Sequence, residues 1–133
     1  MMIIFFCTAK KGSVERLLGD IQTKIHDHRI EVVRTLEALR DRFRRPILDR
    51  AIMILIPVNR EQLKGLISMG NLFDDNPILL VLPDREPTTI SIGHRLYPRF
   101  VTYVDSDFSD LVSVLNKLIH YVTKKADSCH DRP

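Results

Sequence analysis

Ala51-Ile-Met-Ile-Leu-Ile-Pro-Val58 is a continuous apolar run in the middle of the 133-residue chain. Because it has no polar face and is rich in β-branched residues, it is typical of a strand that helices cover on both sides of a parallel sheet. We predict that it forms the central strand. Two similar runs, Met2 to Thr8 and Ile78 to Leu82, predict further buried strands.

Segments with helical spacing of apolar residues separate these runs. Ser13 is a plausible N-cap for a first helix, and Thr35 can cap a second helix that ends at Pro46. Between them, Arg29 to Arg34 has the mixed polarity of an edge strand. Asn59 and Gln62 have the spacing of a capping box and predict a third helix that stops near Gly70.

The last third of the chain continues the same alternation. Pro87 could begin a short, frayed helix, and Phe100 to Val104 predicts a fifth strand. Asp105-Ser-Asp107 then caps a helix with an almost unbroken i, i+3, i+4 apolar series. The chain therefore predicts one doubly wound α/β domain over residues 1–124, followed by a polar, flexible C-terminal tail over residues 125–133.

Composition narrows the class of protein. The charge is only +3, and the arginines between Arg40 and Arg50 alternate with acidic residues and lack aromatic neighbours, so nucleic-acid binding is disfavoured. No run approaches the ~20 apolar residues of a membrane span, and Cys7 and Cys129 are placed as in a protein of a reducing compartment. We expect a cytoplasmic protein without a membrane or nucleic-acid partner.

The final strand and helix carry a family resemblance. With the order and length of the elements over residues 2 to 124, the segment Tyr103-Val-Asp-Ser-Asp-Phe-Ser-Asp-Leu-Val-Ser-Val-Leu115 resembles the receiver domain of bacterial two-component response regulators. The resemblance implies a flavodoxin-like, three-layer sandwich whose five parallel strands have the order 2-1-3-4-5.

The functional positions of that family depart from its pattern. Receivers carry an acidic pair after the first strand, a phosphoryl-accepting Asp after the third, a Ser or Thr after the fourth and a Lys after the fifth. Here the first two positions fall on apolar or small side chains, which supply neither a phosphoryl acceptor nor the oxygens that Mg²⁺ requires. The four positions correspond to Cys7 and Thr8, to Ile56 or Pro57, to residues 82–84, and to Val104 or Ser106.

We therefore interpret the chain as a stand-alone pseudo-receiver. Such a module is non-enzymatic, needs no cofactor, and acts in bacterial signal transduction or regulation by binding another protein or a second copy of itself. Receivers commonly pair through the face of their fourth helix, fifth strand and fifth helix, which here would present aromatic and arginine side chains of the kinds enriched in interfaces. The candidates are Arg95, Tyr97, Arg99, Tyr103, His120 and Tyr121. Alternatively, the tyrosines merely cover the edge of the core.

A second hypothesis is an enzyme that uses Cys7. This cysteine ends the first strand beside Lys10 and Lys11 and before a helix N-terminus, a setting that can lower a thiol pKa. The arrangement resembles the phosphocysteine loop of sugar-transport phosphotransferase B subunits and would suit a phosphocarrier or phosphatase-like enzyme. Only Gly12 and Ser13 could cradle a phosphate, however, so a buried structural cysteine is favoured.

Two further possibilities remain open. Asp84, Asp105 and Asp107 would lie near the carboxyl ends of the strands and could hold a cation, although turn formation and helix capping explain all three. The histidines show no ligand spacing, so we predict no metal site. The strand ends could also form the pocket of a small-ligand sensor.

Overall fold

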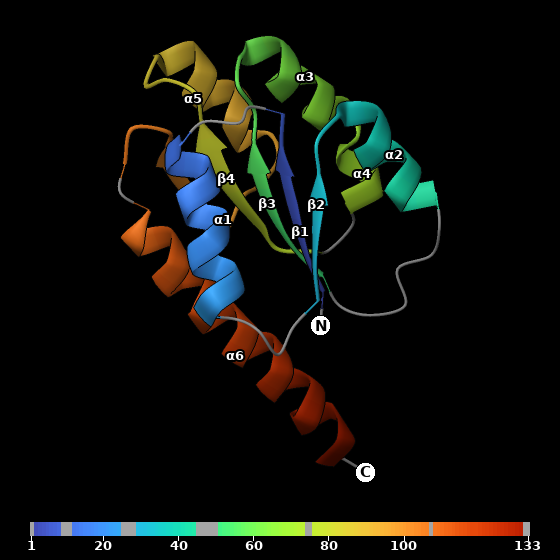
Figure 1. The fold of residues 1–133 in the computed structure, drawn as a ribbon. Coiled ribbons are helices and arrows are strands. Elements are labelled where there is room, and N and C mark those ends of the chain that lie inside the picture. The colour runs from blue at the N-terminus through green and yellow to red at the C-terminus, as the bar shows by residue number, and fades with distance from the viewer. Residues whose placement is uncertain are drawn as a thin grey trace.

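The computed structural model describes residues 2–8, 12–24, 29–44, 51–73, 76–106 and 108–131. Five parallel strands form one sheet in the order β2-β1-β3-β4-β5, as the resemblance implied (Figure 1). Every residue of the three inner strands is buried, which explains their unbroken apolar sequences. The strands are β1 (Met2–Cys7), β2 (Arg29–Val33), β3 (Ala51–Ile56), β4 (Ile78–Leu82) and β5 (Phe100–Tyr103).

The helices cover both faces of this sheet and complete a three-layer sandwich (Figure 1). Alternate residues of β1 point into two separate cores: Ile3 and Phe5 into one, Ile4 and Phe6 into the other. The first core is closed by α1 (Gly12–Lys24) and α6 (Ser109–Asp131). The second is closed by α2 (Leu36–Arg44), α3 (Arg60–Ser68), α4 (Gly70–Phe73) and α5 (Pro87–His94).

Two helix starts have the caps that the sequence predicts. The Thr35 hydroxyl accepts a hydrogen bond from the Ala38 amide (3.0 Å), and the Asn59 side chain accepts one from the Gln62 amide (2.9 Å). The reciprocal half of the capping box takes a different form, because the Gln62 side chain accepts from the amide of Val58 (3.1 Å). The predicted cap residues Ser13 and Asp107 cannot be compared, because they fall outside the described side chains.

The helices differ from the expectations in two places. A short helix, α4, follows α3 where the sequence predicted that the helix stops near Gly70, and α5, which begins at Pro87 as predicted, is regular over its eight residues and not frayed. Helix α6 continues to Asp131, seven residues beyond the expected domain boundary at 124, because no glycine or proline interrupts that stretch. Its last turns extend past the sheet (Figure 1). The flexibility proposed for residues 125–133 stays a prediction.

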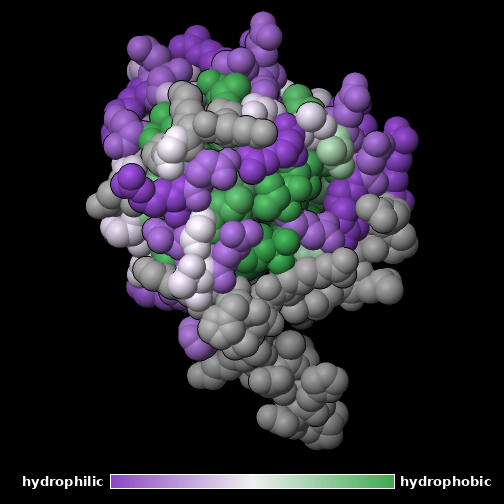
Figure 2. Space-filling model, in the orientation of Figure 1, coloured by the Kyte–Doolittle hydropathy of each residue, from purple (hydrophilic) through white to green (hydrophobic). Residues whose placement is uncertain are grey.

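Strand β2 forms an incompletely covered edge of the sheet. In Figure 2 an apolar area lies between α1 and β2, with hydrophilic side chains around it. The β2 residues Ile30 and Val32 are only half-buried, although both contact the core under α1 and α6. On the other face, Arg42 of α2 pairs with Glu31 (2.5 Å) and so closes the α2 side of this strand. None of the described helices is long and apolar enough to cross a membrane.

Candidate functional site

The carboxyl ends of β1 and β3 lie side by side at the centre of the sheet. Cys7 and Ile56 are register neighbours, and their exposed fractions are 0% and 2%. The small cavity beside them measures about 30 Å³ and has an apolar lining. It is lined by Cys7, Val14, Ile56, Pro57, Val58, Pro83 and Val104. In an open α/β sheet this is where ligands usually bind, but here apolar side chains fill the position.

A neutral hydrogen-bond network covers the outside of this apolar centre. Thr8 Oγ1 lies 2.8 Å from Gln62 Nε2 and 3.2 Å from Gln62 Oε1, so the residue after β1 is joined to the first turn of α3. Gln62 Oε1 also accepts from the Val58 amide just beyond β3. These are amide and hydroxyl groups, which form a polar link between two loops without adding a charge.

The end of β4 carries a charged cluster that sequence reasoning missed. Arg60 Nε donates to Thr89 Oγ1 (2.8 Å), and the buried Thr89 hydroxyl is also hydrogen-bonded to Asp84. Asp84 accepts a further hydrogen bond from the Glu86 amide (2.9 Å). The hydrogen bond from Thr89, the one from the Glu86 amide and the charge of Arg60 together lower the pKa of Asp84 below its ordinary value. The cluster therefore holds an ionised carboxylate between α3 and α5.

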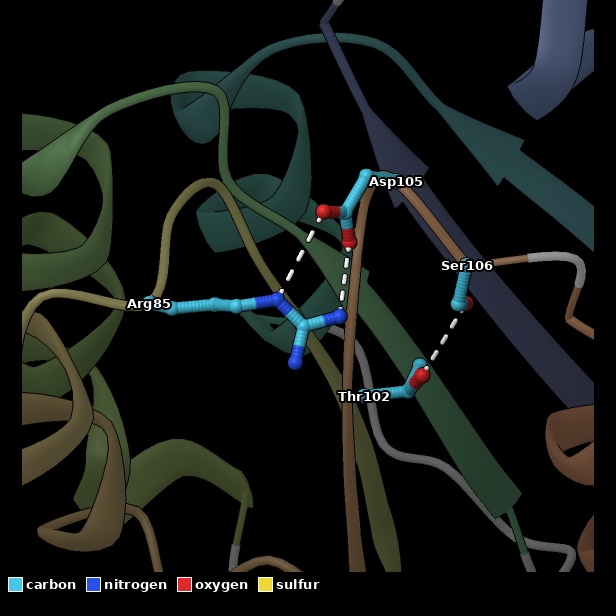
Figure 3. Close-up of polar contacts among 4 residues, drawn as sticks. All are labelled: Arg85, Thr102, Asp105 and Ser106. Atoms are coloured by element: carbon cyan, nitrogen blue, oxygen red, sulfur yellow. Dashed lines mark hydrogen bonds and ion pairs between the residues drawn. The ribbon is translucent and has the colours of Figure 1, made fainter.

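An ion pair between Arg85 and Asp105 joins the loops after β4 and β5 (Figure 3). Arg85 Nη2 and Nε lie 3.0 and 3.5 Å from the two carboxylate oxygens of Asp105, and its guanidinium stacks 4.1 Å from the centroid of the Tyr103 ring. Beside it, Thr102 Oγ1 donates to Ser106 Oγ (3.0 Å). Arg85 and Asp105 are both largely exposed, so the pair itself contributes less than about 1 kcal/mol to stability.

The acidic residues considered for a cation have separate partners where the structure describes them. Asp84 accepts a hydrogen bond from the Glu86 amide, Asp105 pairs with Arg85, and Asp107 lies outside the described residues. Among the residues that the structure describes, no group of three His, Cys, Asp or Glu side chains could hold a metal ion. His94 and His120 are exposed on different helices, and His26, His28 and His130 lie outside the described side chains.

The six predicted interface residues fall into separate places. Arg95, Tyr97 and Arg99 line one groove at the amino end of β5. Tyr103 lies at the other end of that strand under Arg85, and His120 lies on α6, which packs against the opposite face of the sheet from α5. Tyr121 belongs to α6 by its backbone, and its side chain falls outside the described part of the chain.

Arg85 and Gln62 are the residues of the carboxyl edge whose contacts the sequence did not reveal. Arg85 and Asp105 are twenty positions apart, but each closely follows one of two neighbouring parallel strands. Opposite charges placed in this way meet at one edge of the sheet, which is a signal that could have predicted the pair. Gln62 was recognised only by its capping position, and its bond to Thr8 depends on how β1 and β3 pair.

Comparison with known proteins gives a match at the level of fold. No protein-family model matches the chain, and no curated protein matches it. The crystal structure of a response regulator receiver protein from Pseudoalteromonas atlantica superposes with a TM-score of 0.71 at 16% identity, and the match covers 92% of this chain and 99% of that one. The chain therefore has the receiver-like α/β fold.

A second solved structure agrees with this assignment. It is a response regulator protein from Burkholderia pseudomallei, which was crystallised with a phosphorylated aspartic acid, a calcium ion and citrate. It superposes with a TM-score of 0.59 at 10% identity, and the match covers 99% of this chain and 75% of that one. Both matches are therefore likenesses of fold at low sequence identity.

Proposed function

We propose that this chain is a pseudo-receiver: a non-enzymatic module of bacterial signal transduction that binds another protein and takes no phosphoryl group. The observation that carries the proposal is the pair of side chains at the ends of β1 and β3. Cys7 and Ile56 are buried among apolar groups. Neither side chain offers a carboxylate, so neither can accept a phosphoryl group as an aspartate does or give Mg²⁺ an oxygen ligand.

The surrounding polar groups support the same conclusion. The Thr8–Gln62 link joins the loops after β1 and β3 through neutral groups. Two carboxylates of the same edge, Asp84 and Asp105, are each engaged by a cation or by hydrogen bonds. They follow β4 and β5, not the central pair β1 and β3.

The alternative, an enzyme that uses Cys7, has weaker support. The Cys7 side chain is 0% exposed, and the adjoining cavity of about 30 Å³ has room for about one or two water molecules. A thiolate that attacks phosphate must meet its substrate and must be stabilised by nearby positive charge. The cavity beside Cys7 is lined by apolar side chains and is too small to admit a phosphorylated substrate.

Phosphoryl transfer is tested by incubating the protein with Mg²⁺ and acetyl phosphate and then measuring its intact mass. We expect no gain of a phosphoryl group by the wild-type chain. The proposal would be wrong if the mass increased by one phosphoryl group and if this gain disappeared in Asp84→Asn or Asp105→Asn. A gain that disappeared only in Cys7→Ser would instead support the cysteine enzyme.

A further inference from the structure

A surface depression with an apolar floor lies away from the carboxyl edge. It measures about 420 Å³ and opens at the opposite edge of the sheet, between α4 and the turn that joins α5 to β5. We call it the amino-edge groove, because Ile78 begins β4 and Arg99 directly precedes β5. Its lining consists of Ile67, Gly70, Asn71, Phe73, Asn76, Pro77, Ile78, Arg95, Leu96, Tyr97 and Arg99.

The groove combines an apolar floor with a cationic rim. Phe73, Ile78 and Leu96 are each more than nine-tenths buried and form part of the floor. Arg95 and Arg99 are exposed, and neither guanidinium makes an ion pair or hydrogen bond with the described residues. Arginines of other elements, such as Arg42 and Arg85, do have carboxylate partners. Two unpaired arginines beside an apolar floor favour a ligand with both negative charge and apolar surface.

Tyr97 strengthens this assignment. Its side chain is 89% exposed, and its backbone has a φ of 51°, a region that a bulky residue rarely adopts. The Tyr97 amide donates to the carbonyl of His94 (3.1 Å), so the conformation is held by the end of α5. Leu72, on the α4 side, is another exposed apolar side chain at 42%. An exposed tyrosine held in a strained conformation beside two arginines has the composition of a binding hot spot.

We propose that the amino-edge groove binds an extended acidic segment of a partner protein. One apolar or aromatic side chain of that segment would contact the floor at Phe73 and Leu96, beside the Tyr97 ring. Carboxylates on either side of it would pair with Arg95 and Arg99. This inference rests on the proposed role as an interaction module, and it adds the location of the binding surface and the chemistry of the partner. The surface differs from the original six-residue prediction because it excludes Tyr103 and His120.

The inference is tested with a fluorescently labelled set of extended peptides, each with one Leu or Phe flanked by two or three Glu residues. Anisotropy titrations compare wild type with Arg95→Gln/Arg99→Gln and with Tyr97→Ala. The matched control is Arg16→Gln/Arg40→Gln, which removes two exposed arginines elsewhere and gives the same net charge. Loss of two charge-assisted hydrogen bonds should weaken binding of the best peptide about tenfold to hundredfold in the first variant.

Three further readouts complete the test. The control variant should bind as wild type does, peptides with Gln in place of Glu should bind weakly, and added salt should lower the affinity. Asp74 and Asp75 directly follow Phe73 in the sequence, so Asp74→Asn/Asp75→Asn should bind an acidic peptide more tightly than wild type.

Several results would overturn the inference. One is an equal loss of peptide affinity in the Arg95→Gln/Arg99→Gln variant and in the control variant. Another is that the folded wild type binds no acidic peptide. A third is that inorganic phosphate binds as tightly as the best peptide, which would indicate a site for small anions. Self-association in sedimentation equilibrium that the groove variants abolish would identify a second copy as the occupant. None of these results bears on phosphoryl acceptance, so the proposed pseudo-receiver role and the groove can fail separately.

Discussion

At the scale of single residues, two non-glycine positions in the described part of the chain have left-handed backbone conformations, one exposed and one buried. Tyr97 has a φ of 51° and is exposed, whereas Phe108 has a φ of 63° and is buried in the core under α1 and α6. This conformation costs an L-residue roughly 1–2 kcal/mol. At Phe108 the buried ring offsets that cost through its packing. At Tyr97 no comparable burial offsets it, which is consistent with selection for binding and not for stability.

Substituting glycine at these two positions should therefore have opposite effects. Tyr97→Gly relieves the strain and should raise the free energy of unfolding by about 0.5–1 kcal/mol. Phe108→Gly relieves the same strain but removes a buried ring, so it should lower the free energy of unfolding by about 2–4 kcal/mol. Urea unfolding measures both, with Tyr97→Ala as the control that keeps the strain. A destabilised Tyr97→Gly protein would show that the tyrosine side chain supports the fold.

The Asp84 carboxyl makes the stability depend on acid pH. Its pKa in the folded protein is lowered by the Thr89 hydrogen bond first, then by the Glu86 amide and Arg60, while the unfolded chain has the ordinary value of 3.8. Ionisation therefore favours folding, and this contribution is present above pH 3.8 and disappears as the pH falls through the lower, folded pKa. Thr89→Val should raise the Asp84 pKa toward 3.8, and Thr88→Val should leave it unchanged.

A carboxyl-carbon NMR titration of Asp84 measures this effect directly. The same titration also checks the geometry, because the Thr89 hydroxyl accepts from Arg60 Nε in the same cluster. An Asp84 pKa that is the same in wild type and Thr89→Val would contradict the hydrogen bond between these two residues.

At the scale of elements, α5 depends on close contact with the sheet. A Cβ atom added at Gly93 would lie 3.0 Å from terminal carbons of both Leu80 and Leu82 on β4. In α1, by contrast, a Cβ at Gly19 would meet nothing within 4 Å. The two glycines therefore serve different purposes: Gly93 allows a helix to approach a strand, and Gly19 has no packing role.

Alanine at these glycines separates packing from helix propensity. Gly93→Ala should lower the free energy of unfolding by about 1–2 kcal/mol, because overpacking outweighs the gain in helix propensity. Gly19→Ala should raise the free energy of unfolding by about 0.5–1 kcal/mol, because alanine favours the helix and the added methyl group meets no neighbour. Thermal unfolding of both variants checks the pair. If Gly93→Ala were as stable as Gly19→Ala, the close packing of α5 on β4 would be wrong.

The elements differ in how far the sequence could predict them. The inner strands were predictable because burial on both faces leaves them wholly apolar, and the Thr35 and Asn59 caps follow from local hydrogen bonding. Helix α4 was missed because Gly70 is a typical helix-ending residue, yet here it begins a short helix that buries Phe73. Its existence depends on core contacts that no local pattern displays.

At the scale of the whole molecule, the strand order determines which of the candidate residues lie close together. Cys7 and Ile56 come together at the sheet centre because β1 pairs with β3 in register. The six interface candidates were chosen by residue type, but Tyr97 precedes β5 and Tyr103 is its last residue, so the groove and the Arg85 cluster lie at opposite ends of this strand. The groove itself depends on α4, which the sequence did not predict.

The central claim, that the receiver-like fold here works without a phosphoryl acceptor, is tested most directly by backbone amide NMR during titration with Mg²⁺ and beryllofluoride, a mimic of an acyl phosphate. We expect the amides of Cys7, Thr8 and Val58 to keep their positions throughout, because Cys7 and Ile56, which end β1 and β3, carry no carboxylate that could hold either group. Saturable shifts of these amides would contradict it and would mean that the chain retains a phosphoryl-binding site.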